Sequence, residues 1–246
     1  MTADSAQLGN RPGLAFVRAG GVRAGSGVKG EWAPVLDSIG DAERRDVLRL
    51  ATRRRFRRGE VVFHEGDPGD CLHIVADGVF IARSSSTLGE LIAVNIFDRG
   101  SVFGELALLS ASPRRTATVV ALHGGTTLAL ARSHFEELRG RNPRIDRFLL
   151  TVLAERNRRL NDQLVELLFT PVEQRVYRRL LSFADVVGSG DDGWIQLGQS
   201  ELAMLAGTTR STANRVLRRA TEDGVLDLRR GRVRIVDVGD LRARAR

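Results

Sequence analysis

The spacing of hydrophobic residues along the chain changes character twice. Between Arg58 and Leu130, short apolar runs are separated by glycines, as is typical of β-strands joined by tight turns. A helical region follows from about Ser133, and beyond Pro143 leucines recur at spacings of three and four as far as Phe169, which predicts one long helix. The remaining residues alternate short helical segments with short apolar strands. The pattern therefore predicts an all-β part, a long helix and a small mixed part, in that order.

Within the β part, Asp77 and Gly78 stand between the apolar runs "CLHIVA" and "VFIARS". Glycine accepts the positive φ that tight turns require, so this dipeptide predicts a hairpin between two strands. Several short strands at this spacing predict a small antiparallel barrel or roll. A short helix starting at Asp41 is expected before it.

The long helix carries a regular seam of six positions. They are Leu150, Leu153, Asn157, Leu160, Leu164 and Leu167. Such a seam holds coiled coils together, and a buried asparagine at one inner position fixes the register and favours two strands. The seam therefore predicts a parallel homodimer. Packing of this helix against its own domain is the alternative interpretation.

The overall composition is typical of a soluble globular protein, with 42% hydrophobic and 28% charged residues. No apolar run reaches the roughly 18–20 residues that span a bilayer, and the N-terminus lacks a basic-then-apolar signal pattern. The single cysteine, Cys71, cannot form an internal disulfide or a four-cysteine iron–sulfur site. These features predict a cytoplasmic protein without a membrane partner.

Positive charge is concentrated near the C-terminus. The whole chain carries a formal net charge of +8, and 11 arginines against 5 acidic residues lie between Gly207 and Arg246. An excess of this kind favours an anionic partner such as nucleic acid.

The basic region contains "LGQSELAMLAGTTRSTANRVLRRATEDG", which has the pattern of a helix-turn-helix. The apolar residues of "ELAML" give the first helix a buried side, and Gly207 allows the sharp turn. Thr209 is a good N-cap for a second helix that starts at Arg210. The strands "VLDLR" and "RVRIV", joined around Gly231, would form a wing.

The second helix is expected to present polar side chains to the major groove of double-stranded DNA. Arginine can donate two hydrogen bonds to guanine, and Asn214 can pair with adenine. The predicted DNA-binding residues are Thr209, Arg210, Ser211, Asn214, Arg215, Arg218 and, in the wing, Arg230. A solvated, arginine-rich helix face is the alternative, but the turn, the wing and the local charge together favour DNA binding. A dimer carrying two such helices should prefer a palindromic site.

The sequence thus predicts an α+β protein of four parts. Residues 1–30 form a flexible tail, and residues 31–145 form an antiparallel β-roll. Residues 146–170 form the dimerisation helix, and residues 171–246 form a winged helix-turn-helix.

Another segment, "FGELALLSASPRRTATV" at residues 103–119, places charges of both signs beside apolar runs. Glu105 stands near its start, and Arg114 and Arg115 precede its second apolar run. Charges tolerate burial only when each one meets a partner, so the partners of these groups are informative.

The order of motifs resembles that of one known family. "RGEVVF", "EGDPGDCLHIVADG", the 103–119 segment, the leucine seam and the winged helix-turn-helix are together similar to the cyclic AMP receptor protein and fumarate–nitrate regulator (Crp/Fnr) family, over about residues 31–246. The resemblance implies that residues 31–145 are a cyclic nucleotide-binding domain. It also implies a DNA-binding transcription regulator rather than an enzyme, with RNA polymerase as a further partner.

The resemblance makes residues 103–119 the segment that binds the nucleotide. Gly104, Glu105 and Leu106 would open a short helical turn whose amides face the cyclic phosphate. Glu105 would accept a hydrogen bond from the ribose 2′-hydroxyl, and Thr116 would add a hydroxyl. We define residues 103–119 as the cassette.

An arginine of the cassette is expected to neutralise the phosphate. Arg115 lies at the family's distance from Gly104, and Arg114 follows Pro113 as in other cyclic nucleotide domains. Arg115 is the preferred choice and Arg114 the second. An arginine–glutamate pair that stabilises an empty roll is the alternative interpretation.

Recognition of the base departs from the family pattern. Leu160 stands where the receptor protein has the threonine that meets adenine, and leucine cannot hydrogen-bond the base. Asn161, at the position of the serine from the partner chain, offers both a donor and an acceptor. We therefore expect cyclic AMP as the ligand, with cyclic GMP or no ligand as alternatives. Without a ligand the protein would bind DNA constitutively or as an architectural protein.

A metal or redox centre is not expected. The chain has four histidines: His64, His73, His123 and His134. Their spacing is not that of metal ligands. A gas- or redox-sensing relative would need ligands that the lone Cys71 does not supply. Cys71 itself is expected to be a small buried hydrophobe.

Overall fold

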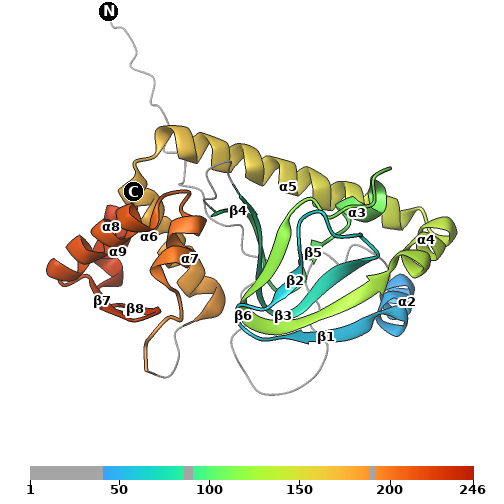
Figure 1. The fold of residues 1–246 in the computed structure, drawn as a ribbon, viewed down its shortest axis with the longest axis horizontal. Coiled ribbons are helices and arrows are strands. Elements are labelled where there is room, and N and C mark those ends of the chain that lie inside the picture. Colours follow the sequence, from blue (N-terminus) through green and yellow to red (C-terminus); the bar gives the residue numbers. More distant parts are fainter. Residues whose placement is uncertain (1–40, 86–90, 189–191) are drawn as a thin grey trace, which may run out of the picture.

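The computed structural model describes residues 41–85, 91–188 and 192–246, so the predicted tail at residues 1–30 lies outside the described residues. The chain forms a sheet domain, a long helix and a small helical domain, in that order (Figure 1). The expected α+β class is confirmed. No helix in the described ranges is long and apolar enough to cross a membrane.

The N-terminal domain is a single antiparallel sheet of six strands, preceded by the helix α2 (Asp41–Leu50). Its strands are β1 (Thr52–Phe56), β2 (Val61–Phe63), β3 (Cys71–Ser85), β4 (Leu91–Phe97), β5 (Val102–Phe103) and β6 (Thr118–Ala131), with helix α3 (Leu106–Leu109) between β5 and β6. The strand order is β1-β6-β3-β4, while β2 pairs with β6 and β5 pairs with β3. This is the antiparallel roll that the sequence predicted.

The hairpin predicted at Gly78 is wrong. Strand β3 continues through this residue and pairs with β6 on both sides of it, from Cys71 to Arg83. Gly78 has a φ of +85°, and the register of the two strands shifts around it. Positive φ therefore serves a bend in a continuous strand of the six-stranded sheet rather than a chain reversal, and both uses favour the same residue.

Aromatic rings fill the inside of the roll. Phe103 lies 5.0 Å from Phe97 and 5.8 Å from Phe80, measured between ring centroids, and Phe80 meets Phe56 edge-on at 5.7 Å. A second apolar cluster joins the sheet to α2, to helix α4 (Arg132–Arg141) and to the first turns of helix α5 (Arg144–Phe169). The long helix α5, expected at 146–170, is thereby fixed to the roll at its N-terminal end.

The C-terminal domain is the predicted winged helix-turn-helix. Its elements are α6 (Val172–Val187), α7 (Gln199–Leu205), α8 (Arg210–Glu222), β7 (Leu226–Arg229), β8 (Arg232–Ile235) and α9 (Val238–Arg244). Gly207 has a φ of +59° in the turn between α7 and α8. The side chain of Thr209 accepts a hydrogen bond from the Thr212 amide at 3.2 Å, so it caps α8 as expected.

The C-terminal domain also contacts the roll directly. Arg58, in the turn between β1 and β2, donates to both carboxylate oxygens of Glu201 on α7, at 2.8 and 2.6 Å. Helix α5 runs across both domains (Figure 1). The two domains are thus joined by this helix and by a polar contact between residues far apart in the sequence.

Replacing Gly125 with alanine is expected to destabilise the fold by about 1–3 kcal/mol, the usual cost of overpacking. Gly125 faces the bend in β3, and an added Cβ would lie 2.2 Å from the carbonyl oxygen of Asp77. Gly140 in α4 is the matched control, because nothing lies within 4 Å of a Cβ built there. Gly140→Ala should be neutral or stabilising by up to about 1 kcal/mol. Urea unfolding measures both, and equal effects would contradict the close contact at the bend.

Candidate functional site

A cavity opens between α3, the start of β6 and the long helix α5. It contains about 340 Å³ of space free of protein atoms, part of which is open to solvent. Its lining includes Phe63, Phe97, Gly104, Leu106, Arg115, Thr116 and Arg156. Four residues that the sequence assigned to the ligand, Gly104, Leu106, Arg115 and Thr116, are therefore brought together at one place.

Gly104 is required by the close approach of Arg115. Its φ is +82°, and a Cβ added there would lie 2.7 Å from Nη1 of Arg115. The Gly104 carbonyl accepts a hydrogen bond from the same nitrogen at 3.1 Å. Any larger residue would displace the guanidinium from its position in the cavity wall.

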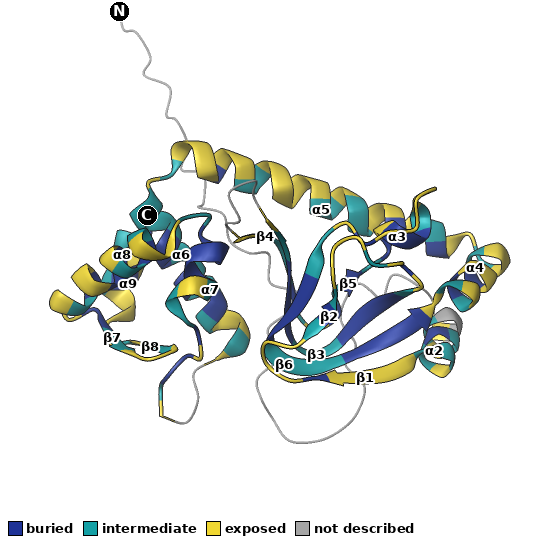
Figure 2. Ribbon diagram, in the orientation of Figure 1, coloured by how far each residue is buried: buried dark blue, intermediate teal, exposed yellow. Residues whose placement is uncertain are grey.

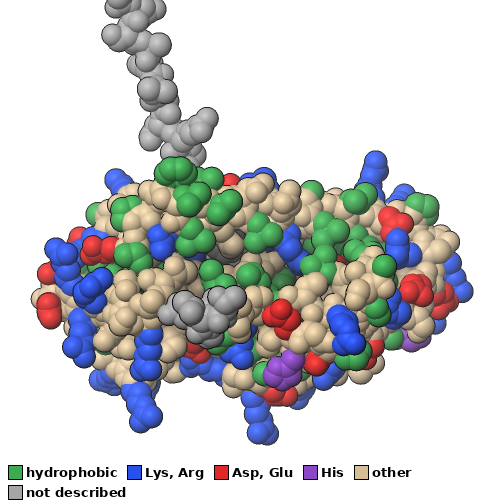
Figure 3. Space-filling model, turned by 45° about the horizontal axis from the view of Figure 1, so that its top comes forward, with side chains coloured by type: hydrophobic (Ala, Val, Ile, Leu, Met, Phe, Trp, Pro, Cys, Tyr) green, Lys and Arg blue, Asp and Glu red, His purple; other side chains and the backbone are tan. Residues whose placement is uncertain are grey.

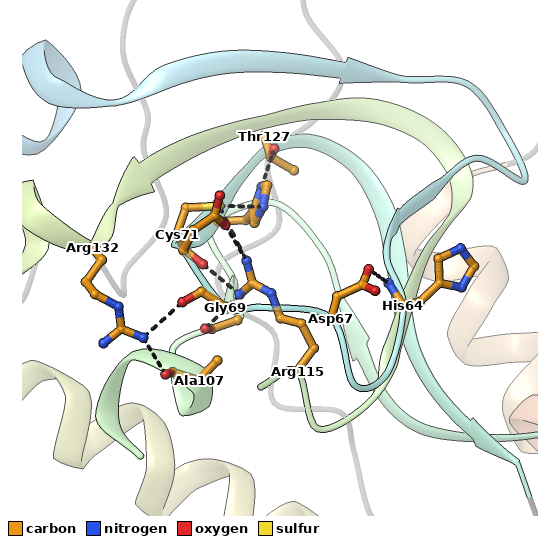
Figure 4. Close-up of polar contacts among 11 residues, drawn as sticks. His64, Asp67, Gly69, Cys71, Ala107, Arg115, Thr127 and Arg132 are labelled. Carbon is orange, nitrogen blue, oxygen red and sulfur yellow. Dashed lines mark hydrogen bonds and ion pairs between the residues drawn. The ribbon is translucent and has the colours of Figure 1, made fainter. Parts of the chain in front are cut away.

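Arg115 is only 4% exposed and is held from several sides (Figure 4). It donates to the Cys71 carbonyl at 2.7 Å and to Oδ1 of Asp70 at 3.1 Å. Its guanidinium carbon lies 4.1 Å from the ring centroid of Phe63, a cation–π contact. Its Nε is buried and has no hydrogen-bond partner among the described residues.

Arg114 lies outside this arrangement. Its side chain is exposed and donates to the Gly66 carbonyl at 2.8 Å. It is not part of the cavity lining. The geometry favours Arg115 over Arg114 as the residue that meets a ligand, in the order the sequence gave them, and the assignment itself stays a prediction.

Glu105 is completely buried beside the cavity. Its Oε1 accepts a hydrogen bond from Nη1 of Arg156 on α5 at 2.5 Å, and Arg156 also donates to the Val102 carbonyl at 3.0 Å. Oε2 of Glu105 has no partner within the described part of the chain. Arg156 is a residue that sequence reasoning missed. The one feature of the sequence that could have indicated it is its position one turn before Leu160, on the helix expected beside the cassette.

The position of α3 is fixed by an arginine from the next helix. Arg132 donates to the carbonyls of Gly69 and Ala107, at 2.9 and 2.8 Å (Figure 4). A Cβ on Gly69 would lie 2.2 Å from that of Ala107, so the two segments touch directly. The cassette is therefore held against the turn that also carries Asp70 and Cys71.

The base-recognition residues do not reach the cavity within one chain. Leu160 is 43% exposed, and Asn161 is also exposed on α5. Neither belongs to the cavity lining. A role for Asn161 therefore needs a second copy of the chain, as the resemblance implied.

A buried histidine lies next to Cys71, with 3.5 Å between its Nε2 and Sγ of Cys71. His73 is 0% exposed, its Nδ1 is 3.0 Å from Oγ1 of Thr127, and its ring stacks on Phe103. Burial, together with the charges of Arg115 and Arg54, lowers the pKa of His73 from 6.5 to about 3, and the charge of Asp70 opposes this shift. This histidine is therefore neutral at physiological pH.

Cys71 is half-buried rather than fully buried. Burial raises the pKa of its thiol, and the hydrogen bond with Asp70 acts in the same direction. Across residues 41–85, 91–188 and 192–246, no group of three His, Cys, Asp or Glu side chains is placed to hold a metal ion.

Helix α8 presents an arginine-rich face. Arg210, Arg215 and Arg218 are exposed, and no ion pair involves them within the described part of the chain. Exposed Ser211 bonds to the Thr209 hydroxyl at 2.9 Å. In the wing, Arg230 is exposed at the tip, beside Gly231 with its φ of +73°. Since these arginines make no ion pair within the described ranges, their guanidinium groups can contact phosphates or bases.

Asn214 differs from the other predicted DNA-binding residues. It is half-buried, and its Oδ1 is buried without a hydrogen-bond partner among the residues that the structure describes. Reading of adenine by Asn214 would require its side chain to rotate outward.

The predicted seam on α5 is largely uncovered (Figure 2). Leu150 is 66% exposed and Leu164 is 56% exposed. Leu160, Leu167 and Asn157 are also exposed, and Leu153 is half-buried. Hydrophobic side chains gather along this helix in the space-filling view (Figure 3). Helix α5 contacts the roll through its first turns and through Arg156, and these contacts leave most of the seam exposed, so the alternative of full intramolecular packing is not supported.

Comparison with known proteins gives the class of this molecule. Residues 53–142 match the model of the cyclic nucleotide-binding domain, and residues 174–244 match that of the Crp-like helix-turn-helix domain. Together with the observed fold, these matches define a cyclic nucleotide-binding transcription regulator of the Crp type, a class that does not comprise enzymes.

Individual relatives extend the match. The "CRP-like cAMP-activated global transcriptional regulator" of Mycobacterium tuberculosis (strain ATCC 25618 / H37Rv) is 33% identical over 195 residues, which cover 78% of this chain and 87% of that protein. The "Cyclic AMP receptor protein" of Thermus thermophilus is 32% identical over 203 residues, covering 82% and 92%. The chain belongs to the Crp/Fnr family.

Solved structures agree on the fold. The c-di-GMP-responsive global regulator CLP of Xanthomonas campestris gives a TM-score of 0.70 at 22% identity, covering 80% of this chain and 99% of that one. A Crp/Fnr regulator of Eubacterium rectale gives 0.72 at 16% identity, covering 86% and 97%.

Lowering the pH is expected to destabilise the protein through His73. Its pKa is about 3 in the folded state and 6.5 ordinarily, so between these values only the unfolded state binds the proton. The contribution is therefore complete above about pH 6.5 and is lost as the pH falls, by about 2 kcal/mol at about pH 5. Denaturant titrations at neutral pH and at about pH 5 measure the loss.

His73→Gln is the matched variant for this measurement. Glutamine can still bond to Thr127 but does not titrate, so the variant should lack this part of the pH dependence. The same loss in both proteins would assign the effect to other groups.

Proposed function

We propose that the protein is a homodimeric, sequence-specific transcription regulator whose DNA binding is controlled by a cyclic nucleotide, most simply cyclic AMP. The nucleotide would occupy the cavity beside the cassette, and the two α8 helices of the dimer would read the DNA. The family membership supports the general class. The ligand, the dimer and the control are supported by particular contacts in the chain.

The observation that carries the proposal is a pair of unsatisfied buried atoms of opposite kinds at one cavity. Nε of Arg115 is a donor without an acceptor, and Oε2 of Glu105 is an acceptor without a donor, among the described residues. Leaving such atoms unpaired in a low-dielectric interior is unfavourable. A ligand that presents an anionic oxygen and a hydroxyl would satisfy both at once.

A 3′,5′-cyclic nucleotide has these two groups close together. Its phosphate suits the guanidinium of Arg115, and its free ribose 2′-hydroxyl suits Glu105. Arg156 already neutralises one oxygen of Glu105, so a hydroxyl donor is a better partner for the other than a second cation. Relatives from Mycobacterium tuberculosis and Thermus thermophilus that are named for cyclic AMP support the same ligand class.

The dimer is supported by the uncovered seam on α5. Four leucines of the seam are exposed in the single chain, and a partner helix would remove their side chains from water. A second chain would also place Asn161 of the partner near the nucleotide base. With two α8 helices, the dimer should prefer an inverted repeat with half-sites about one turn of DNA apart. RNA polymerase is a further partner by family membership.

A second candidate is a regulator whose roll holds no nucleotide. It is favoured by the contacts that Arg115 already makes with Cys71, Gly104 and Asp70, and by the inability of Leu160 to bond a base. In that case Arg115 would be a structural residue and DNA binding would be constitutive.

Calorimetry with cyclic AMP and cyclic GMP separates the two candidates. Arg115→Ala is expected to weaken cyclic AMP binding by about 1.5–3 kcal/mol, the range for a hydrogen bond to a charged group. Arg114→Ala, which removes an exposed neighbour of equal charge, is the control and should change the affinity much less. No heat with either nucleotide would favour the unliganded roll. Equal affinities of wild type and Arg115→Ala for a nucleotide would instead refute Arg115 as the residue that meets the phosphate. Thermal unfolding of each variant verifies that it is folded.

The seam is tested by making it charged. Leu153→Glu combined with Leu164→Glu is expected to give monomers, because two buried carboxylates would face their own copies. Sedimentation measures the mass, and gel shift should show weak binding to an operator selected with the wild type. Leu168→Glu, with an exposed leucine outside the seam, is the control and should remain a dimer. An unchanged dimer in the double variant would place the interface elsewhere.

A further inference from the structure

One arginine on α6 bonds to the C-terminal ends of two other helices. Arg175 donates to the carbonyl of Thr170, the C-cap residue that follows α5, at 2.8 Å. Its Nε donates to the carbonyl of Ala206, the C-cap residue of α7, at 3.1 Å, and its Nη2 to that of Gly207 at 3.3 Å. Helix C-termini carry unpaired carbonyls and partial negative charge, so one cation satisfies both ends. The end of α5 and the turn of the helix-turn-helix thus share a guanidinium.

A second arginine repeats this connection one turn later. Arg179 donates from Nε to the Leu205 carbonyl on α7 at 3.1 Å and from Nη2 to the carboxylate of Glu166 on α5. Glu166 is only 6% exposed. Its other carboxylate oxygen lies 3.5 Å from Nη1 of Arg178, so Glu166 pairs with two arginines of α6, and removing its charge leaves both without this partner.

A direct apolar contact closes the same junction. A Cβ built on Gly207 would lie 2.6 Å from Cδ2 of Leu167, so the last turn of α5 packs against the turn of the helix-turn-helix without space between them. Leu167 is also a position of the predicted dimer seam. The orientation of the turn is therefore fixed to α5 rather than only to its own domain.

We propose that Glu166, Arg175 and Arg179, here called the clamp, are positioning residues for DNA recognition. They attach α7 and the turn to the last turn of α5, and α8 follows because it shares a buried core with α7. A rotation of α5 about its axis is then passed to α8. The control of this rotation by a nucleotide rests on the proposed function, whereas the attachment does not.

The cavity and the clamp lie on the same helix. Arg156 reaches the cavity from α5, and Glu166 follows it by ten residues, or about 15 Å along an α-helix. A change at Arg156 and Glu105 can therefore act on α8 through a continuous helix and two arginines. The clamp is where a movement of α5 would be transmitted to α7 and α8.

The test compares clamp variants with a matched arginine variant in the full-length protein. Glu166→Gln removes the charge and keeps the shape, and Arg179→Lys keeps the charge and loses the two-sided bonding. Arg244→Gln is the control, because Arg244 pairs with Asp223 and Asp240 inside the C-terminal domain. Thermal unfolding verifies that all three are folded.

Hydrogen exchange without ligand is the first measurement. The clamp variants are expected to exchange about tenfold faster at the amides of Thr170 and Thr208, since local opening there costs less. Arg244→Gln should leave both amides unchanged. Equal exchange in the wild type and the clamp variants would overturn the attachment, whether or not a nucleotide binds.

Operator binding with and without cyclic AMP is the second measurement. Binding of one ligand commonly changes the affinity for a second ligand by about 5–150-fold when the two sites are coupled. In the clamp variants, cyclic AMP should change the affinity for the operator by about twofold or less. Nucleotide affinity without DNA should remain as in the wild type. If cyclic AMP changes the operator affinity of Glu166→Gln by the same factor as in the wild type, the clamp does not connect the cavity to α8. A purely structural role of the clamp would leave this factor unchanged.

Half-site spacing is the third measurement, and it separates the clamp from the nucleotide control. If cyclic AMP has no effect on operator binding by the wild type, the proposed control by a nucleotide is wrong. The clamp can still be tested by selecting operators from a library in which the spacing between half-sites is random. The wild type should accept one spacing and the clamp variants several, because α8 is then less tightly oriented on α5. Identical spacing preferences would overturn the proposal.

Discussion

The structure depends on the constraint that a charge taken out of water must meet a partner. Glu105, Arg115 and Glu166 are all less than a tenth exposed, and each joins one element of the fold to another. Arg115 ties the cassette to the turn before β3, Glu105 ties it to α5, and Glu166 ties α5 to α6. The roll, the long helix and the DNA-binding domain meet where these charges are buried. The contacts that join the parts are therefore also the contacts that satisfy these buried charges.

The sequence predicted those features whose signals are local. Thr209 caps the second helix of the helix-turn-helix, Gly207 forms its turn, and the long helix spans Arg144–Phe169 where 146–170 was expected. Capping and periodicity act within one or two turns, so the sequence reveals them. The wrong hairpin prediction at Gly78 also rested on a local signal. A glycine with positive φ suits a hairpin and a bend equally, and only the pairing of both halves with β6 distinguishes them.

Sequence reasoning singled out the buried charges that stood out against an apolar background and missed those that did not. Arg115 and Glu105 interrupt hydrophobic runs, so they attracted attention. Arg156, Arg175 and Arg179 were missed, since they lie among many others in a chain with 38 lysines and arginines. Their partners are backbone carbonyls and distant carboxylates, which leave no spacing pattern in the sequence.

The continuity of α5 between Arg156 and Glu166 makes its length a functional quantity. Each residue of an α-helix adds about 1.5 Å and turns the chain by about 100°, so one inserted residue would move the face that carries Glu166 far from α6 while leaving every side chain intact. An insertion of seven residues, close to two full turns, would restore the phase while lengthening the helix by about 10 Å. What relates the cavity to the DNA is thus an angle set by a residue count, and composition alone does not preserve it.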